Sequence, residues 1–313
     1  MEVLRYAAFT EHPAGGNPAG VVLDATGADT TVMQRVAAQV GCSETAFLFP
    51  VGDDDHVIRY FSPLAEVSFC GHATIAAAVA HGDRYGPRPL TLHTRSGRIE
   101  VTTHGSASGA LAATFTSVAP QLRELPPGDL AALLAVLRWD RSDLDPALPP
   151  RVAFAGAWHP VLAVRHRERL TRLEHDVEAL QAVMAARRWT TVDLVWRAGP
   201  TVFHCRNPFA PGGVVEDPAT GAAAAALGGY LRALDLVPLP VDLTVLQGED
   251  LGRPSRIGVH VPAERDRGIS VTGHAVPLPG TAGQGRVPVE KSLDRDARDL
   301  VSHPLSASAR SRP

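Results

Sequence analysis

The sequence predicts an α+β protein built from two similar domains that face each other across a cleft. Its 313 residues, 45% of them hydrophobic, suffice for two cores of about 150 residues each. Segments with strand character alternate with amphipathic or Ala-rich helical segments in both halves. In addition, residues 61–78 resemble residues 209–226: both begin with an F-x-P turn and end in an Ala-rich helix. Chance is the alternative, because Ala-rich helices look alike.

Composition narrows the function classes. The net charge is −3 and no basic stripe is present, which argues against nucleic acid as the main partner. No apolar run approaches the roughly 18–20 residues of a membrane span, and the N-terminal residues lack a signal peptide pattern, so we expect a cytoplasmic protein with no membrane partner. The three cysteines form no CxxC pair, which makes a disulfide framework or a structural zinc site unexpected.

Residues 1–118 are predicted to form the first domain. Thr30–Val40 carries its apolar residues on one helical face and is followed by Gly41, a suitable helix stop. The Gly- and Pro-rich stretch His12–Gly20 predicts a loop, and His72–Ala80 predicts a helix that ends at Gly82. Strands are predicted at Val3–Phe9, Val21–Leu23, Ala46–Phe49, Val57–Phe61, Leu90–His93, Arg98–Thr102 and Ala110–Phe115.

Residues 119–280 are predicted to form the second domain, whose last strand could return to the first. The boundary is placed at the Pro-containing connection Ala119–Pro127. Helices are predicted at Asp129–Trp139, Asp176–Arg188 and Ala219–Leu231, and strands at Val152–Phe154, Val161–Val164, Val192–Trp196, Val202–Cys205, Leu243–Leu246, Ile257–Val261 and Ile269–Val271. Residues 281–313 are polar and charged, and we expect a mobile tail there.

Two loops that lead into the Ala-rich helices are candidate anion sites. A helix start leaves free N–H groups and a positive dipole end, and small residues allow close approach to the backbone. Gly71 and Ala73 supply such residues in the first loop, and Gly221 and Ala222 in the second. Together they would suit a small carboxylate. The alternative is that these residues only permit tight packing around a buried helix.

Three ionisable side chains lie at the edges of these loops. Glu44 stands between a helix stop and an apolar strand, where desolvation would raise its pKa toward a range useful for proton transfer. His72 and Asp217 occupy paired positions in the two loops and could orient a substrate or relay protons. The alternatives are an exposed loop carboxylate, a satisfied histidine and a helix cap. No nucleotide-binding or nucleophile-elbow motif is present, so we expect cofactor-free chemistry.

These residues fall in motifs that resemble the PhzF-like phenazine biosynthesis isomerase family, which is related to diaminopimelate epimerase. The resemblance covers about residues 1–280. It rests on five blocks in order: Ala8–Thr10 with Gly16–Val22, Ser43–Phe47, Phe61–Thr74, Glu216–Gly221, and Gln247-Gly248 with Gly252–Ser255.

The resemblance implies two domains related by pseudo-two-fold symmetry, each a curved mixed sheet wrapped around a central helix, with the active site between them. It also implies a homodimer with no metal or organic cofactor. Carried over by motif, Glu44 would be the general acid/base, with His72 and Asp217 as helpers. Gly221 and Ala222 would cradle the carboxylate, and the remaining expected lining residues are Asn17, Ser43, Gly71 and Ala73.

Two departures affect the expected reaction. Ala222 stands where the family usually has Ser, which removes a hydroxyl contact and puts the phenazine substrate itself in doubt. An epimerase of the related type needs two cysteines, one at each motif; here Cys70 lies at the first motif, but the second motif has Asp217-Pro218. We therefore expect an isomerase that moves a double bond in a small unsaturated carboxylate of specialised metabolism, such as phenazine antibiotic biosynthesis. The alternatives are an amino-acid epimerase and a non-catalytic carboxylate-binding protein on the same fold.

Overall fold

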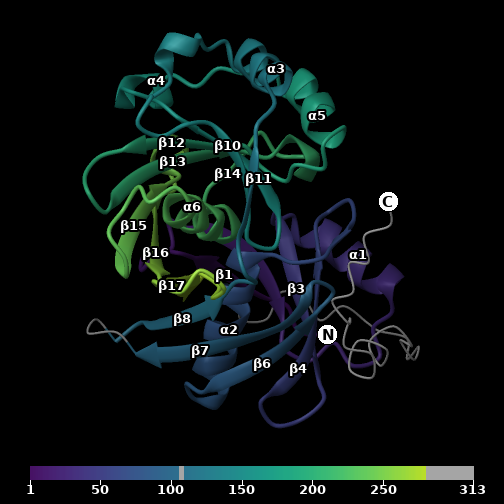
Figure 1. The fold of residues 1–313 in the computed structure, drawn as a ribbon. Coiled ribbons are helices and arrows are strands. Elements are labelled where there is room, and N and C mark those ends of the chain that lie inside the picture. The colour runs from purple at the N-terminus through teal and green to yellow at the C-terminus, as the bar shows by residue number, and fades with distance from the viewer. Residues whose placement is uncertain (106–108, 280–313) are drawn as a thin grey trace, which may run out of the picture.

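The computed structural model describes residues 1–105 and 109–279, and the predicted tail lies outside this part of the chain. Figure 1 shows two long helices, α2 (Gly71–Tyr85) and α6 (Gly221–Ala233), each lying against its own curved set of strands. The predicted mixture of helices and strands is confirmed. Most residues of both helices are buried, and both are rich in alanine, which lets strands pack close to them.

The first half carries one further helix, α1 (Thr30–Val40), as predicted. The Asp29 side chain accepts a hydrogen bond from Val32 N, and Gly41 ends the helix with a φ of 67°. Its apolar face packs outside the sheet, against β2 to β4. The strands of this half are β1 (Leu4–Ala8), β2 (Asn17–Val22), β3 (Glu44–Pro50), β4 (Asp55–Phe61), β5 (Glu66–Val67), β6 (Pro89–Thr94), β7 (Gly97–Gly105) and β8 (Leu111–Thr116).

The second half places three helices on the outer face of its sheet, where they bury a second apolar cluster: α3 (Pro127–Leu137), α4 (Arg167–Thr171) and α5 (Val177–Ala185). Its strands are β9 (Gln121–Glu124), β10 (Arg151–Phe154), β11 (Trp158–Ala163), β12 (Asp193–Arg197), β13 (Val202–Pro208), β14 (Glu216–Asp217), β15 (Val241–Gln247), β16 (Ser255–Val261) and β17 (Ser270–Pro277). Short 3-10 turns occur at Arg141–Asp143, Ala210–Gly212 and Glu249–Leu251.

The same strand pairing occurs in both halves. β2 runs parallel to β3 and β3 antiparallel to β4, just as β11 runs parallel to β12 and β12 antiparallel to β13. A parallel partner follows each central helix: β6 beside β4, and β15 beside β13. β17 pairs with β16 and also with β1 and β8, so the last strand joins the strands of both halves into one sheet.

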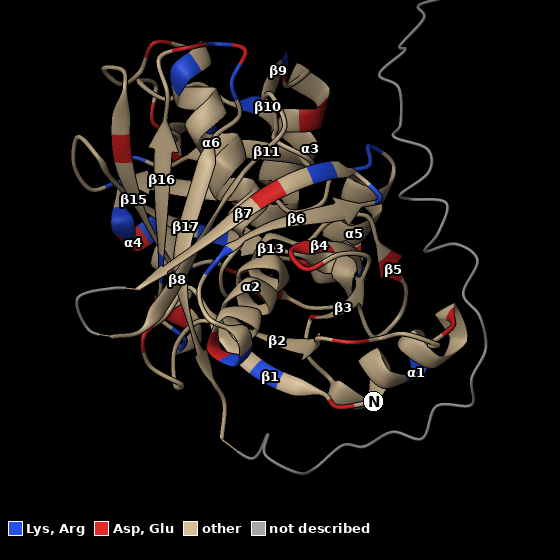
Figure 2. Cartoon of the chain, turned by 90° about the horizontal axis from the view of Figure 1, so that it is seen from below, with Lys and Arg blue, Asp and Glu red and all other residues tan. Residues whose placement is uncertain are grey.

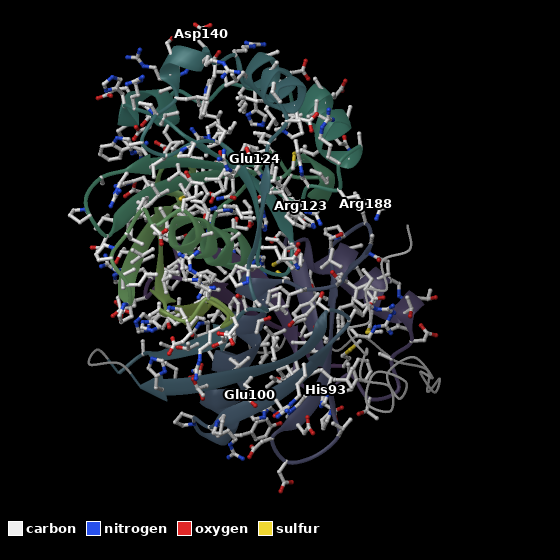
Figure 3. All side chains as sticks on the ribbon, in the orientation of Figure 1. His93, Glu100, Arg123, Glu124, Asp140 and Arg188 are labelled. Atoms are coloured by element: carbon white, nitrogen blue, oxygen red, sulfur yellow. The ribbon has the colours of Figure 1, made fainter. Side chains whose placement is uncertain are left out.

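Several predicted element bounds differ from the structure, including those of one loop, one helix and one connection. Asn17–Gly20 is strand rather than loop, because Gly20 serves close packing: a Cβ there would lie 2.6 Å from Thr45 Oγ1. Helix α2 continues past Gly82 to Tyr85, since packing of a buried helix overrides the low propensity of one glycine. The connection Ala119–Pro127 contains strand β9, which pairs with β10. Figure 3 shows Arg123 and Glu124 on this strand; the Arg123 guanidinium stacks 3.8 Å over the Trp158 ring.

In the view of Figure 2, the blue positions of Lys and Arg and the red positions of Asp and Glu are interspersed along the cartoon. Among residues 1–105 and 109–279, no helix is both long and apolar enough to cross a bilayer.

Candidate active site

A small cavity lies where the two central helices begin. Its volume is about 70 Å³, which favours a small ligand. Both halves of the chain contribute to its wall. The lining residues are Glu44, Val67, Phe69, Cys70, Gly71, His72, Ala157, His159, Thr190, Thr191, Phe209, Asp217, Thr220, Gly221 and Ala222.

The N-termini of α2 and α6 meet at this cavity. Gly71 and Gly221 are the first residues of the two helices. A Cβ built on Gly71 would lie 3.3 Å from both Ala222 N and Gly221 Cα. Free N–H groups and the positive ends of two helix dipoles therefore converge from separate halves, an arrangement that favours a bound anion.

We expect Gly71→Ala to raise the KM for a carboxylate substrate roughly tenfold, which corresponds to the loss of about one hydrogen bond to the substrate. The added methyl group would press on the Ala222 amide, and backbone yields less readily than a side chain. Gly128→Ala in α3 is the matched control, because no atom lies within 4 Å of its Cβ position. Steady-state kinetics would check this, and equal KM values for both variants would contradict it.

Glu44 begins β3 and is 4% exposed. Burial raises the pKa of its carboxyl from 4.5 to about 7, and hydrogen bonds from Ser43 and Cys70 oppose the rise. Its Oε2 lies 3.4 Å from His72 Nε2. A carboxyl with a pKa near neutrality on the wall of a cavity can both accept and return a proton at physiological pH.

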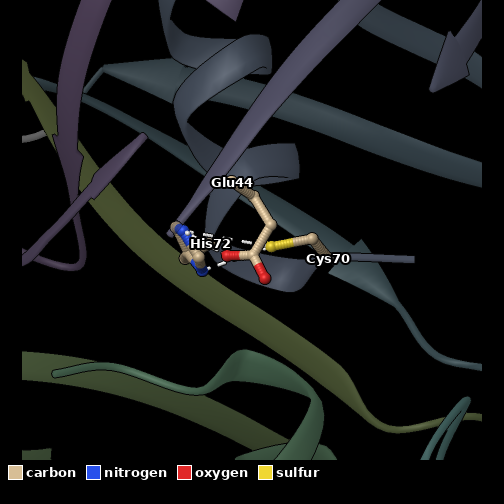
Figure 4. Close-up of side chains that lie close together, drawn as sticks. All are labelled: Glu44, Cys70 and His72. Carbon is tan, nitrogen blue, oxygen red and sulfur yellow. Dashed lines mark hydrogen bonds and ion pairs between the residues drawn. The ribbon is translucent and has the colours of Figure 1, made fainter. Parts of the chain in front are cut away.

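The His72 ring faces both the Cys70 thiol and the Glu44 carboxyl, and dashed lines join it to each of them (Figure 4). Burial lowers the pKa of His72 to about 3 and raises that of Cys70 well above 9, so the imidazole is neutral and the thiol protonated. Cys70 Sγ lies 3.2 Å from His72 Nδ1, and Ser43 Oγ lies 3.2 Å from Nε2. If the thiol donates to Nδ1, the ring proton is on Nε2 and points toward Glu44 and Ser43.

The donor atoms of Glu44, Cys70 and His72 all lie within 4.8 Å of one another. Carboxylate, thiolate and imidazole ligands suit zinc, so these three could hold a metal ion, and they form the candidate group among the described residues. Glu44 Oε2 has no hydrogen-bond partner among the described residues, and the sequence predicts no metal.

Asp217 also lines the cavity, and side chains from both halves of the chain hold it. Asn17 Nδ2 donates to its Oδ1 at 2.6 Å, and Thr220 Oγ1 donates to its Oδ2 at 2.7 Å. Gln247 Nε2 donates to the Asp217 backbone carbonyl at 2.7 Å. Burial raises the pKa of Asp217 from 3.8 to about 8, and the nearby Glu44 carboxylate raises it further, so a protonated Asp217 can share a site with an ionised Glu44.

Above about pH 7, where the histidines are neutral in both the folded and the unfolded state, we expect the free energy of unfolding to fall as the pH rises to about 9. Glu44 and Asp217 have higher pKa values in the folded protein than in the unfolded chain, so the folded state binds more protons through this range. Glu44→Gln should weaken this dependence and exceed the wild type in stability at pH 9 by roughly 1–3 kcal/mol. Urea unfolding at pH 7 and 9 would check it, with Glu124→Gln, at an exposed side chain, as control. Parallel pH profiles for wild type and Glu44→Gln would contradict the expectation.

Six of the predicted site residues line the cavity: Glu44, Gly71, His72, Asp217, Gly221 and Ala222. The other three are not among its lining residues. Asn17 donates a hydrogen bond to Asp217, Ser43 contacts His72, and Ala73 is fully buried in the first turn of α2.

Sequence reasoning missed His159, Thr191 and Phe69, which also line the cavity, and Gln247 behind it. Gln247 lies in the Gln247-Gly248 motif, a signal that could have singled it out. His159 and Thr191 belong to no motif, and no local sequence signal marks them.

Comparison with known proteins shows the family of this chain. The family profile described as "PhzC-PhzF: Phenazine biosynthesis-like protein" matches residues 6–280. An "Uncharacterized isomerase" of Deinococcus radiodurans is 34% identical over 268 residues, 83% of this chain and 87% of that protein. The trans-2,3-dihydro-3-hydroxyanthranilate isomerase of Pseudomonas chlororaphis is 30% identical, with 90% of this chain and 96% of that protein covered.

A solved structure shows the same fold. The Bacillus anthracis phenazine biosynthesis protein of the PhzF family superposes with a TM-score of 0.79 at 28% identity, and the match covers 89% of this chain and 98% of that one. The names of the two curated relatives confirm the predicted enzyme class, an isomerase. The chain belongs to the PhzC–PhzF family of phenazine biosynthesis-like proteins.

Proposed function

We propose that the protein is a cofactor-independent isomerase that moves a proton, and with it a double bond, in a small unsaturated carboxylate. One observation carries the proposal: Glu44, a buried carboxyl with a pKa of about 7, lines the same cavity as two converging helix N-termini. The helix termini would bind the substrate carboxylate, and Glu44 would act on a nearby carbon.

In the proposed reaction, one proton leaves one carbon of the substrate and returns to another. The Glu44 carboxylate removes a proton from an sp³ carbon, and the C–H electron pair becomes a new double bond while the existing double bond shifts. The helix N-termini stabilise negative charge that develops on the conjugated substrate carboxylate. Protonated Glu44 then returns the proton to another carbon on the same face. His72 orients Glu44 through Nε2, and Asp217, protonated at neutral pH, binds a polar group of the substrate.

The named relative suggests a substrate class. The Pseudomonas chlororaphis protein is named for trans-2,3-dihydro-3-hydroxyanthranilate, an unsaturated amino and hydroxy carboxylate. We propose a compound of this class for the present chain, in specialised metabolism. Ala222 offers no hydroxyl at the carboxylate cradle, so the preferred substrate is expected to differ from that of the phenazine enzymes.

The test is incubation with trans-2,3-dihydro-3-hydroxyanthranilate and related unsaturated carboxylates in D2O, followed by NMR. The proposal predicts that deuterium enters carbon positions of at least one compound and that the double bond moves. Absence of deuterium from every compound in the panel would contradict it.

Amino-acid epimerisation is the second candidate, because the Cys70 thiol lines the cavity. An epimerase that used this thiol would lose activity in Cys70→Ala, whereas the isomerase should stay largely active. Chiral analysis of products from an amino-acid panel distinguishes the two reactions.

A further inference from the structure

His159 is a buried histidine of the cavity wall that the proposed mechanism does not use. It lies in β11 and is 0% exposed. Its Nδ1 lies 2.9 Å from Thr191 Oγ1, whereas Nε2 has no hydrogen-bond partner in the part of the chain that the structure describes. A buried polar atom without a partner is costly, which indicates that Nε2 is reserved for something that enters the cavity.

A chain of hydrogen bonds assigns the proton on this ring. Asn207 Nδ2 donates to Asp193 Oδ1 at 3.2 Å, so the Asn207 carbonyl oxygen faces Thr191. Thr191 Oγ1 donates its only proton to that oxygen at 2.7 Å. The Thr191 hydroxyl must therefore accept from His159, which places the ring proton on Nδ1. Burial lowers the pKa of His159 to about 4, so at neutral pH Nε2 carries no proton and can only accept.

The strand register relates His159 to a residue already placed in the site. Parallel pairing sets Ala19 beside Glu44 in the first half and Val161 beside Asp193 in the second. Asn17 lies two residues before Ala19, and His159 lies two residues before Val161. The two side chains therefore occupy equivalent places in the two halves. Asn17 donates its amide protons to Asp217 and to the Ala219 carbonyl, whereas His159 Nε2 has no partner within residues 1–105 and 109–279.

We propose that His159 is a specificity-determining residue whose Nε2 accepts a hydrogen bond from a hydroxyl or amino group of the substrate. The inference rests on the proposed function and assigns a binding partner to the amino or hydroxyl donor of the proposed substrate class. Thr191 is the positioning residue, because its hydroxyl holds His159 in the accepting tautomer. Asn207 and Asp193 hold Thr191 in turn.

The experiment measures binding of four stable aromatic probes by calorimetry at pH 7.5: benzoate, 3-hydroxybenzoate, anthranilate and 3-hydroxyanthranilate. Benzoate offers the carboxylate alone, and the others add one or two donors. The variants are His159→Leu, Thr191→Val and Thr191→Ser. Thr191→Val keeps the shape of the side chain and removes the hydroxyl, whereas Thr191→Ser retains it. Thermal unfolding verifies that each variant is folded.

The wild type should bind at least one donor-bearing probe about tenfold more tightly than benzoate. This preference should disappear in His159→Leu and Thr191→Val and persist in Thr191→Ser, while benzoate affinity changes little. A preference that survives in folded Thr191→Val, or a wild type without any preference, would overturn the role of His159.

Deuterium exchange in the wild type separates the two proposals. Exchange without a donor preference contradicts only the role of His159. A His159-dependent preference without exchange of any substrate contradicts only the isomerase reaction.

Discussion

Glu44→Gln is expected to slow deuterium exchange into the substrate by roughly 10²–10⁴-fold, the loss typical of a positioned general base. Glutamine fills the same volume and keeps a carbonyl oxygen near His72, but it cannot accept the proton from carbon. Because the helix N-termini are unchanged, binding of benzoate should change much less than exchange. The measurement is NMR of exchange rates for both proteins in D2O.

Two further variants control for structural effects at Glu44. Glu44→Asp keeps the carboxylate but withdraws it from the cavity, and should retain more exchange than Glu44→Gln. Glu124→Gln, at an exposed side chain of β9, should exchange like the wild type. An unchanged rate in folded Glu44→Gln would remove Glu44 from the mechanism.

Arg206→Met is expected to destabilise the protein by about 3–5 kcal/mol, because it leaves a buried charge unpaired. The Glu216 side chain is 2% exposed and receives Arg206 Nε at 2.9 Å and Nη2 at 2.5 Å. Arg206 Nη1 also donates to the carbonyls of Leu170 and Thr171. Glu216 directly precedes Asp217, so the loss should also disturb the cavity wall. Urea unfolding at pH 7 measures the effect.

The double variant Arg206→Met/Glu216→Leu tests the physical reason. Removing both charges should recover much of the stability lost in the single variant, since buried ion pairs can often be replaced by apolar side chains. Arg98→Met, at the exposed pair with Glu100, should change the free energy of unfolding by less than about 0.5 kcal/mol. Equal losses for Arg206→Met and Arg98→Met would contradict the account.

The sequence predicts those elements of the fold that have a local signal. Thr30–Val40 shows a one-sided apolar pattern with a cap at each end, and the helix has the predicted bounds. Gly20 has no such signal, because its need for glycine comes from Thr45 on a neighbouring strand. The two-residue strands β5 and β14 were likewise not predicted, since they exist only through pairing with β4 and β13.

Residues 61–78 and residues 209–226 match in sequence at a constant offset, but the strand pairing in the structure does not keep this offset. The sequence pairs Phe61 with Phe209, but in the strand ladders Phe61 pairs with Glu66 and Pro208 with Glu216. The second loop is therefore three residues longer. Aligned this way, the buried ion pair Arg59–Glu66 corresponds to Arg206–Glu216, at 2.7 and 2.5 Å. Both precede a central helix, and neither was predicted.

The residues of the site likewise fall into those that have a local sequence signal and those that do not. Motifs placed Glu44, His72 and Asp217 around one cavity, because each lies beside a helix start or a strand end that can be recognised locally. His159 could not be found from sequence: its significance depends on Thr191 and Asn207, which belong to other segments of the chain.

A crystal structure with bound benzoate tests the central claim most directly. The account predicts the carboxylate at the N–H groups of the α2 and α6 N-termini, with Glu44 facing a ring carbon at contact distance. A benzoate seated elsewhere, or a Glu44 side chain turned away from the ring, would contradict it.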